Sequence, residues 1–301
     1  MRIVSLVPSA TEIVCALGLA DALVGISHDC DYPPEIRGRQ VLSGAVVTLD
    51  MPSGAIDAAI RAQVHNGLSV YHLDADRLNA LSPDLILTQE LCEVCAPSFT
   101  EVRRAARILS DRTQLVSLEP HGLDDILETI ALVGDLAGAH RAARQVVLEL
   151  RDRIERIRRL AIPSPRPRVA CLEWLDPVFA AGHWVPEMID LAGGTDGLGR
   201  AREKSTEVSW DAVCAYDPEI IVVAACGFDI ARTRLEVSLL TDRPGWRDLS
   251  AVRDGRVYIA DGGAYFSRPG PRVVHGLESL SAIIRTREQI DALDGVEHLG
   301  H

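Results

Sequence analysis

The sequence predicts a two-lobed α/β fold, in which Rossmann-like lobes with mainly parallel sheets are bridged by one long α-helix. Three observations predict it. Strand-like and helix-like segments alternate along both halves of the 301-residue chain, which is the order that produces parallel sheets covered by helices. An uninterrupted helical pattern lies between the two halves. A short motif, in which a helix is followed by a proline turn and an apolar strand, occurs once in each half.

The helical pattern between the halves covers residues 141–161 and contains neither proline nor glycine. One face of such a helix would carry apolar residues that follow one another at intervals of three or four positions: Val147, Leu150, Ile154, Ile157 and Ala161. At 1.5 Å per residue, such a helix is about 30 Å long. It is long enough to join two lobes, although an amphipathic helix packed on a single domain would show the same apolar face.

The first half should begin with a strand over residues 3–6. Ser9-Ala-Thr-Glu12 is a capping-box pattern, so we expect the following helix to start at Ser9. Several glycines and a proline within residues 43–70 predict an irregular excursion that contains one helix near residues 55–64. The other elements expected here are strands at residues 22–26, 70–71, 84–88 and 115–118 and helices at residues 75–81, 98–109 and 123–136.

The second half repeats this order. The expected elements are strands at residues 168–172, 219–224 and 256–260 and helices at residues 186–192, 210–215 and 272–285. Residues 78–87 and 212–223 share the helix–proline–strand motif, and the tail to residue 301 looks frayed. We therefore expect an N-terminal α/β lobe over residues 1–120, a helical linker over residues 121–162 and a C-terminal α/β lobe over residues 163–301.

Composition and charge exclude several classes of protein. The formal net charge of −12 argues against nucleic acid or an anionic membrane surface as the main partner. The chain has no apolar run of about 18 residues, so membrane insertion is not expected. Met1-Arg2 leads directly into the first strand without a signal-peptide pattern, and the cysteine count of seven is odd. These features predict a cytoplasmic location with reduced thiols, or an exported protein whose start has been misassigned.

Side chains with binding chemistry follow directly after the predicted strands. Ligands of open α/β sheets bind outside the carboxyl ends of the strands, so two facing lobes would bring these segments into one cleft. Aromatic residues make up only 4% of the chain, yet Tyr32, Trp174, Phe179, Trp184, Tyr265 and Phe266 all lie in these segments. This predicts a large, flat, partly apolar ligand, unless these aromatics belong to the cores of the lobes. Arg268 either contacts an acidic group of the ligand or caps a carbonyl.

The cysteines divide into two groups. Cys15, Cys171 and Cys214 fall on predicted helices or strands and are expected to be small buried apolar residues. The remaining four, which fall on the strand-end loops, are Cys30, Cys92, Cys95 and Cys226. If these four thiols converge, they could hold zinc or an iron–sulfur cluster. His28 and His183 are possible nitrogen ligands.

Catalytic patterns are few. The sequence has no G-x-S-x-G, no phosphate-binding P-loop and no H-E-x-x-H motif. Asp29 and Asp31 could act as acid and base, but an acidic loop in an acidic protein is usually solvated. The sequence therefore gives no clear enzymatic reaction, and a binding protein is the preferred interpretation.

Several motifs resemble the iron-siderophore/vitamin B12 periplasmic-binding family, which contains the class III solute-binding proteins. The motifs are Ser5-Leu-x-Pro8-Ser-x-Thr-Glu12, Ala16-Leu-Gly-Leu, Leu23-Val-Gly25, Asp31-Tyr-Pro33 and Ser82-Pro-Asp-Leu-Ile86. The similarity is greatest to the cobalamin-binding members. It implies two α/β lobes bridged by one helix, a metal complex bound between the lobes and an ABC permease as partner.

The resemblance also implies roles for individual residues. Pro8 lies in the loop after the first strand, Tyr32 matches a tyrosine of the cleft, and Phe179 and Tyr265-Phe266 match aromatics of the second lobe. Gly44 and Gln89 stand where the family has tryptophans, and the cleft cysteines are not part of the family pattern. One surface glutamate per lobe docks on the permease in this family, and Asp76 and Asp211 occupy similar places.

The main hypothesis is therefore a solute-binding protein of the ABC-transporter type that holds cobalamin, another corrinoid or an iron chelate. Its predicted ligand-binding residues are Pro8, Ser9, Tyr32, Gln89, Trp174, Phe179, His183, Trp184, Tyr265, Phe266 and Arg268. The alternative is a cytoplasmic thiolate metal protein or iron–sulfur protein, either an enzyme or a metallochaperone, that uses the four loop cysteines.

Overall fold

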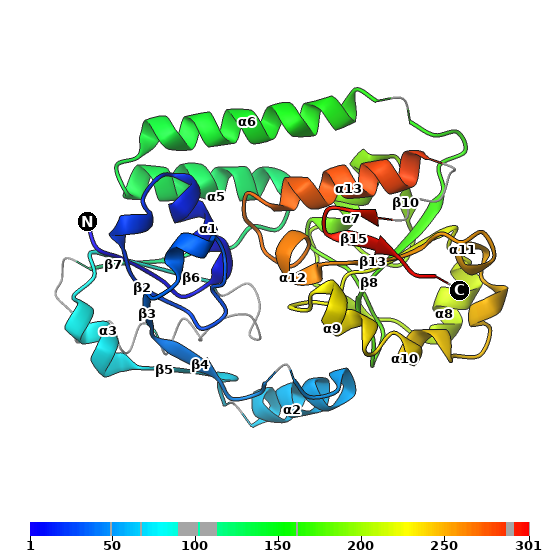
Figure 1. Cartoon of the computed structure of the whole chain (residues 1–301), viewed down its shortest axis with the longest axis horizontal. Helices are drawn as coiled ribbons and strands as arrows, with labels where there is room; N and C mark the ends of the chain where they lie inside the picture. Colours follow the sequence, from blue (N-terminus) through cyan, green and yellow to red (C-terminus); the bar gives the residue numbers. More distant parts are fainter. Residues whose placement is uncertain are drawn as a thin grey trace. The chain divides into compact units, whose positions relative to one another are not determined.

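The computed structural model describes residues 1–48, 50–66, 68–89, 102, 113–160, 162–286 and 292–300 (Figure 1). The chain divides into two compact units. Unit 1 comprises Met1–Met51, Ala58–Pro120 and Asp124–Leu150, and unit 2 comprises Pro52–Asp57, His121–Leu123 and Arg151–His301. Each unit contains its own sheet with helices around it, so the predicted α/β class with two lobes is confirmed.

The sheet of unit 1 has five parallel strands in the order β3-β2-β1-β6-β7. These are β3 (Gln40–Val41), β2 (Leu23–Ile26), β1 (Ile3–Ser5), β6 (Leu85–Thr88) and β7 (Gln114–Ser117). The central strands β1 and β6 are buried throughout, as continuous apolar runs in a parallel sheet should be. Val4 and Ile86 pack there with Leu42 and Leu78 in one core cluster.

Helices and a small ribbon complete unit 1. They are α1 (Pro8–Ala16), η1 (Ala20–Ala22), η2 (Pro34–Ile36), the antiparallel pair β4 (Ser43–Ala45) and β5 (Tyr71–Leu73), α2 (Ser53–His65), α3 (Ala75–Leu81) and α5 (Leu123–Leu136). The first turn of α2 and Leu123 of α5 belong to unit 2. Of the helix expected at residues 98–109, only Val102 lies within the described residues, where it is helical and fully buried.

The prediction that Ser9 caps the first helix is wrong. Helix α1 begins one residue earlier, at Pro8, and Val7 is the N-cap residue. A proline fits the first helical position because its φ angle is already helical and its missing N–H would have no partner there. Ser9 therefore lies inside the first turn, where it is buried.

The sheet of unit 2 is mixed. Its parallel centre consists of β10 (Thr195–Asp196), β8 (Arg168–Trp174), β12 (Ile220–Val223) and β13 (Val257–Ala260), and its antiparallel strands are β9 (Phe179–Ala180), β11 (Thr206–Glu207), β14 (Ala292–Leu293) and β15 (Val296–His298). The surrounding helices are α7 (Val185–Ala192), α8 (Trp210–Tyr216), α9 (Ile230–Arg234), α10 (Ser238–Thr241), η3 (Trp246–Asp248), α11 (Ser250–Arg253), α12 (Gly262–Tyr265) and α13 (Val273–Arg285). Gly193 caps α7 with a φ of 98°, as its sequence position predicts.

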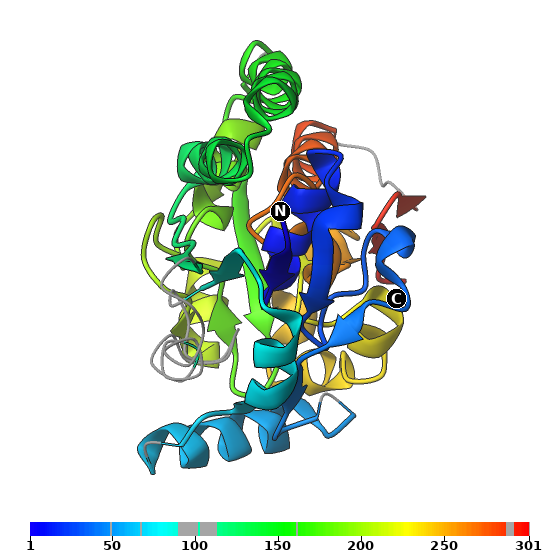
Figure 2. The ribbon, with the colours of Figure 1, turned by 90° about the vertical axis from the view of Figure 1, so that its left-hand side faces the viewer.

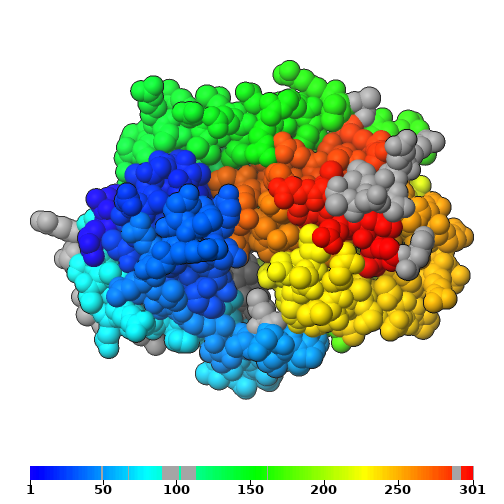
Figure 3. Space-filling model, viewed as in Figure 1, coloured from blue at the N-terminus to red at the C-terminus, as the bar shows by residue number. Residues whose placement is uncertain are grey.

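The expectation of a frayed tail is wrong for residues 292–300. Strand β15 pairs antiparallel with β13, and Val296 is buried in this edge. His298 adds a contact of 2.8 Å between its Nε2 and the carbonyl oxygen of Gly255. The red surface of this C-terminal hairpin adjoins the yellow surface of α9, and Glu297 accepts from Arg234 of α9 at 2.6 Å (Figure 3). Polar partners that are far away in sequence therefore order a segment with a weak local pattern.

The long helix predicted in the middle of the chain is α6 (His140–Arg158), which begins in unit 1 and ends in unit 2. Of the five residues of its predicted apolar face, Ala161 lies outside the described residues, and the other four are at most 8% exposed. In unit 1, α5 and α6 lie side by side and antiparallel (Figures 1 and 2). They are so close at Gly134 that an added Cβ would lie 2.3 Å from the Cβ of Ala143. No described helix is both long and apolar enough to cross a bilayer.

The predicted helix–proline–strand motif occurs in both units. Residues 74–88 of unit 1 correspond to residues 209–223 of unit 2 without a gap: α3 matches α8, and β6 matches β12. Asp74 caps α3 by accepting from the N–H of Arg77, and Ser209 caps α8 by accepting from the N–H of Ala212. Both helices end in a left-handed non-glycine residue before a proline, with φ of 43° at Ser82 and 45° at Asp217.

Candidate functional site

The carboxyl edge of the unit 1 sheet is rich in hydroxyl groups. Thr11 donates from Oγ1 to Ser5 Oγ at 2.8 Å, and Ser5 donates to the carbonyl oxygen of Val7 at 2.9 Å. The same Thr11 oxygen lies 3.0 Å from Sγ of Cys30. These contacts tie the loop after β2 to the end of β1 and the start of α1, and they give Cys30 a neutral polar neighbour.

A second network at this edge involves His28. Ser43 donates from Oγ to Ser27 Oγ at 3.2 Å and accepts from the backbone N–H of His28 at 3.2 Å. Nδ1 of His28 lies 2.9 Å from Ser43 Oγ, and its Nε2 lies 3.4 Å from Oδ1 of Asp29. The ring centroid of His28 is also 5.3 Å from that of Tyr71. Through its Nδ1 and its backbone N–H, which both lie next to Ser43 Oγ, His28 connects the loop after β2 to β4.

The predicted ligand residues of unit 1 differ in accessibility. Tyr32 is 43% exposed, whereas Ser9 and Gln89 are buried and Pro8 is half-buried. Tyr32 is thus the one of these four that presents a large surface to solvent. An added Cβ at Gly44 would lie 2.2 Å from Cε1 of His72, so the imidazole fills the space where a larger side chain would begin.

Trp174 and Phe228 form a tilted aromatic pair in unit 2. Trp174 is the last residue of β8 and pairs with Phe179 of β9. Its ring lies 5.1 Å from the ring of Phe228, over which the Arg232 guanidinium sits at 4.2 Å. The Trp174 indole N–H donates to the carbonyl oxygen of Asp176 at 3.1 Å. Phe228 was not among the predicted site residues, although its place directly after β12 was a sufficient signal.

Trp184 and Phe266 are buried, with exposed fractions of 4% and 3%. The Trp184 indole N–H donates to the carbonyl oxygen of Phe266 at 2.8 Å. Their rings therefore belong to the core of unit 2, and the hydrogen bond fixes the segment after α12 to the start of α7.

His183 lies in a constrained turn next to Trp184. Its φ is 53°, and its backbone pairs with both Glu203 and Arg202, at 2.6 and 2.7 Å. Burial lowers the pKa of His183, and the charges of His121 and Lys204 lower it further. The two imidazole centroids are 6.3 Å apart with nearly parallel planes. A neutral imidazole has a lone pair that can bind a metal centre. His121, the neighbour of His183, was not among the site residues that the sequence suggested.

Tyr265 is held by side chains on several sides. Its ring stacks on His275 at 4.8 Å, and the Arg272 guanidinium lies 5.6 Å from its centroid. Nε2 of His275 in turn lies 3.2 Å from Oδ2 of Asp294. At Gly295 of the C-terminal hairpin, an added Cβ would be 2.1 Å from the Tyr265 ring. The hairpin therefore takes part in orienting this predicted ligand residue.

Residues 3–263 match the family model of periplasmic binding proteins. The chain belongs to this family. An ABC transporter substrate-binding lipoprotein of Bacillus subtilis is 24% identical over 296 residues, covering 94% of this chain and 79% of the relative. The vitamin B12-binding protein of Vibrio cholerae is 23% identical over 294 residues, covering 96% of this chain and 90% of the relative. A periplasmic heme-binding protein from Pseudomonas aeruginosa has the same fold, with a TM-score of 0.71, 20% identity and coverage of 100% and 98%.

Membership in the periplasmic binding protein family corrects one prediction. The expectation of a cytoplasmic location is wrong, because the relatives are described as periplasmic binding proteins or substrate-binding lipoproteins. That expectation depended on the residues that precede the first strand in this sequence, which is a weaker indication than a match along most of the chain.

The comparisons support the solute-binding hypothesis and not the thiolate alternative. Cys92 and Cys95 lie outside the described residues. Among the residues that the structure does describe, no three His, Cys, Asp or Glu side chains are grouped in a way that could hold a metal ion. Cys30 and Cys226 are half-buried and belong to unit 1 and unit 2, respectively.

Glu173 is a further acidic residue at the carboxyl edge of unit 2 that the sequence analysis did not select. Burial raises the pKa of its carboxyl group, although the Ser205 hydroxyl and the Gly182 backbone N–H both donate to it and lower the pKa. Its place next to Trp174 at the end of the central strand could have been read from the sequence.

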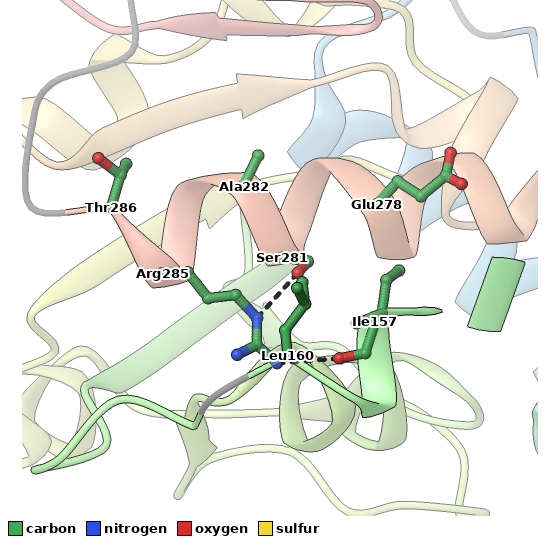
Figure 4. Close-up of a pocket in the computed structure, with 7 residues that line it drawn as sticks. All are labelled: Ile157, Leu160, Glu278, Ser281, Ala282, Arg285 and Thr286. Carbon is green, nitrogen blue, oxygen red and sulfur yellow. Dashed lines mark hydrogen bonds between the residues drawn. The ribbon is translucent and has the colours of Figure 1, made fainter. Parts of the chain in front are cut away.

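A separate cavity of about 510 Å³ lies between the end of α6 and α13 (Figure 4). Its lining residues are Ile157, Leu160, Glu278, Ser281, Ala282, Arg285 and Thr286. Arg285 donates from Nε to Ser281 Oγ at 3.0 Å and from Nη2 to the carbonyl oxygen of Ile157 at 3.3 Å. None of the predicted ligand residues lines this cavity, and its arginine caps the end of α6.

Proposed function

We propose that this protein is the solute-binding component of an ABC-type uptake system and that its ligand is a flat metal chelate, either a corrinoid or a haem-like iron complex. The observation that carries this proposal is the pair of partly accessible rings of Trp174 and Phe179, which lie at the end of β8 and on β9, with Trp174 supported from behind by the buried ring of Phe228. Aromatic faces at strand ends suit a large and partly apolar ring system. The vitamin B12-binding and heme-binding relatives support the same class of ligand.

The proposed contacts differ in kind. Tyr32, Trp174, Phe179 and Tyr265 would supply apolar faces, because all four are at least partly accessible. Trp184 and Phe266 would act from the core by fixing the loops that carry other contacts. The remaining proposed members are Pro8, Ser9 and Gln89 at the edge of unit 1 and His183 and Arg268 in unit 2.

His183 has a distinct proposed role. A cobalt or iron centre with an open axial position accepts a neutral nitrogen ligand, and the lowered pKa of His183 favours the neutral imidazole. Arg268 would pair with an acidic group at the rim of the chelate. These two contacts would favour ligands with an accessible metal and a peripheral carboxylate over fully saturated complexes.

Asp76 and Asp211 are the proposed contacts to the permease. Both are exposed, and both occupy the second position of the equivalent helices α3 and α8. A carboxylate near a helix N-terminus is stabilised there and available for an arginine of a partner. Asp76→Asn and Asp211→Asn should leave ligand affinity unchanged and lower ligand uptake in cells that carry the permease. Unchanged uptake in the double variant would refute this docking assignment.

Equilibrium titration tests the proposed ligand class. Purified protein should be titrated with cobalamin, cobinamide, haemin and ferric chelates while absorbance of the ligand and tryptophan fluorescence are recorded. At least one should bind with a Kd below about 100 μM, since a ligand-sized site normally gives several kcal/mol more than that limit requires. Failure of all of them to bind would refute the proposal.

A further inference from the structure

The buried residues of helix α2 lie in its first turn. Of its 13 residues, only Ser53 and Ile56 are buried, at 0% and 1% exposure, while Val64 near its end is 41% exposed. The buried turn belongs to unit 2, and the helix from Ala58 onward belongs to unit 1. A helix with so little buried surface depends on the few tertiary contacts that it makes. The contacts of its first turn therefore contribute strongly to the position of this end of α2.

Glu236 supplies the main polar contact of this turn. The backbone N–H of Ser53 donates to Oε2 of Glu236 at 2.8 Å, and the other carboxylate oxygen of Glu236 accepts from Arg232. The Glu236 side chain is only 12% exposed. A carboxylate at this position satisfies an N–H that the helix itself leaves without a partner and interacts favourably with the helix dipole.

A second close approach is made by the next residue. An added Cβ at Gly54 would lie 2.6 Å from Oδ2 of Asp176, so the backbone of α2 passes directly over this side chain. The carbonyl oxygen of Asp176 is also the acceptor of the Trp174 indole N–H. The first turn of α2 thus lies next to Asp176, whose backbone binds the indole of Trp174.

Phe228, the second ring of the pair, is connected to Glu236 through Arg232. Arg232, which pairs with Glu236, lies 4.2 Å above the Phe228 ring, and Phe228 lies 5.1 Å from Trp174. Contacts thus connect α2 to the two rings through Glu236 and Arg232. A second set of contacts connects Trp174 through Asp176 back to α2. A shift of any one of these side chains would therefore change its contacts with two neighbours.

We propose that Glu236 is a positioning residue for ligand binding, because it fixes the first turn of α2 and the guanidinium that supports Phe228 and Trp174. This proposal depends on the proposed function in one respect, namely that Trp174 contacts the ligand. Docking of α2 and ordering of the ring are then coupled: a ligand that orders Trp174 stabilises the docked turn, and the docked turn strengthens ligand binding by the same factor.

The test uses Glu236→Gln, which keeps the shape of the side chain and removes its charge. Glu155→Gln is the matched control, since Glu155 forms a glutamate–arginine pair with Arg158 on α6, at a more exposed place and outside the proposed site. Without ligand, amide hydrogen exchange in residues 53–57 should be about tenfold faster in Glu236→Gln, the effect of a lost charge-assisted hydrogen bond. It should be unchanged in the control. Equal exchange in Glu236→Gln and wild type would overturn the proposal.

Further measurements distinguish coupling between α2 and the ligand from a local loss of stability in α2. With cobinamide as the probe, ligand should slow exchange of residues 53–57 in the wild type and dissociate about tenfold faster from Glu236→Gln than from the control. In the absence of ligand, Trp174→Leu should also speed exchange of residues 53–57. If Trp174→Leu leaves this exchange unchanged, the coupling is refuted. If no chelate binds the wild type, the proposed function fails, and the two ligand-free comparisons still decide the role of Glu236.

Discussion

Arg153 of α6 forms a bidentate ion pair with Glu278 of α13, with Nε–Oε1 and Nη2–Oε2 distances of 2.8 and 2.6 Å. The hydrogen bond from Arg153 lowers the pKa of Glu278, burial opposes this effect, and the charge of Arg153 adds to the lowering. The pair joins the end of the long helix to the helix that begins beside Tyr265. It therefore links α6 to the helix that lies next to the proposed ligand residue Tyr265.

Glu278→Gln should lower the free energy of unfolding by about 1 kcal/mol at pH 7, a modest value because both side chains are partly exposed. The folded-state pKa of Glu278 lies below its unfolded value, so the stabilisation is present above the unfolded pKa and is lost as the pH falls through the folded one. Urea unfolding should show a smaller difference between variant and wild type at pH 3 than at pH 7. The same difference at both pH values would contradict this account of the pair.

Gly262 should not tolerate a side chain. An added Cβ would lie 2.1 Å from the carbonyl oxygen of Ala225, which is backbone and cannot rotate away. Gly262→Ala should lower the free energy of unfolding by about 2–3 kcal/mol and weaken ligand binding, because α12 carries Tyr265. Gly300→Ala is the control, since nothing lies within 4 Å of the added carbon there. Thermal unfolding of both variants checks this, and a neutral Gly262→Ala would show that the loop after β12 can move.

Tyr265 should act on the ligand through its ring. Tyr265→Ala should raise the Kd for the best-binding chelate by about 10–100-fold, whereas Tyr265→Phe should change it little. Trp210→Ala is a suitable control, because Trp210 stacks on Trp246 and under Arg243 at the start of α8. It should lower stability and leave the Kd unchanged. A Kd that responds equally to Tyr265→Ala and Trp210→Ala would indicate a general loss of structure instead of a lost contact.

Cys15 should react slowly with thiol reagents. Burial raises the pKa of its thiol to about 11 from an ordinary value of 9.0, and Glu35 adds to the effect while Arg39 opposes it. The thiolate fraction at pH 8 is then about 100-fold lower than in the unfolded chain. Mass spectrometry of iodoacetamide-treated protein should show this ratio between native and urea-unfolded samples, with the native rate still rising between pH 9 and pH 10. Cys15 is half-buried and not fully buried as its helical position had predicted, and native labelling as fast as unfolded labelling would refute the raised pKa of its thiol.

The sequence was most informative where structure depends on local patterns. The apolar face of α6, with Val147 and Ile154 on it, follows from spacing alone, and the expected range of α3 matches the observed one. The repeated motif was recognisable because Pro83 and Pro218 both terminate a helix and are followed by fully buried strands. Such features depend on residues that lie within about ten positions of one another, so one sequence contains the necessary information.

Features set by distant partners could not be predicted in this way. The contact between Ser53 and Glu236 joins residues 183 positions apart, and β15 is ordered by pairing with β13. For the proposed site, the sequence identified Trp174 and Tyr265 from their places after strands. It did not identify His121, because its relevance depends on which imidazole lies next to it, and Phe228 was passed over although its place after β12 was a signal.

The most direct test of the central claim is a crystal structure of the protein with a bound chelate that the titration has identified. We expect the macrocycle or chelate to lie against the rings of Trp174, Phe179 and Tyr265. A ligand bound instead in the cavity lined by Ile157 and Arg285, or anywhere that leaves all three rings without contact, would contradict this claim.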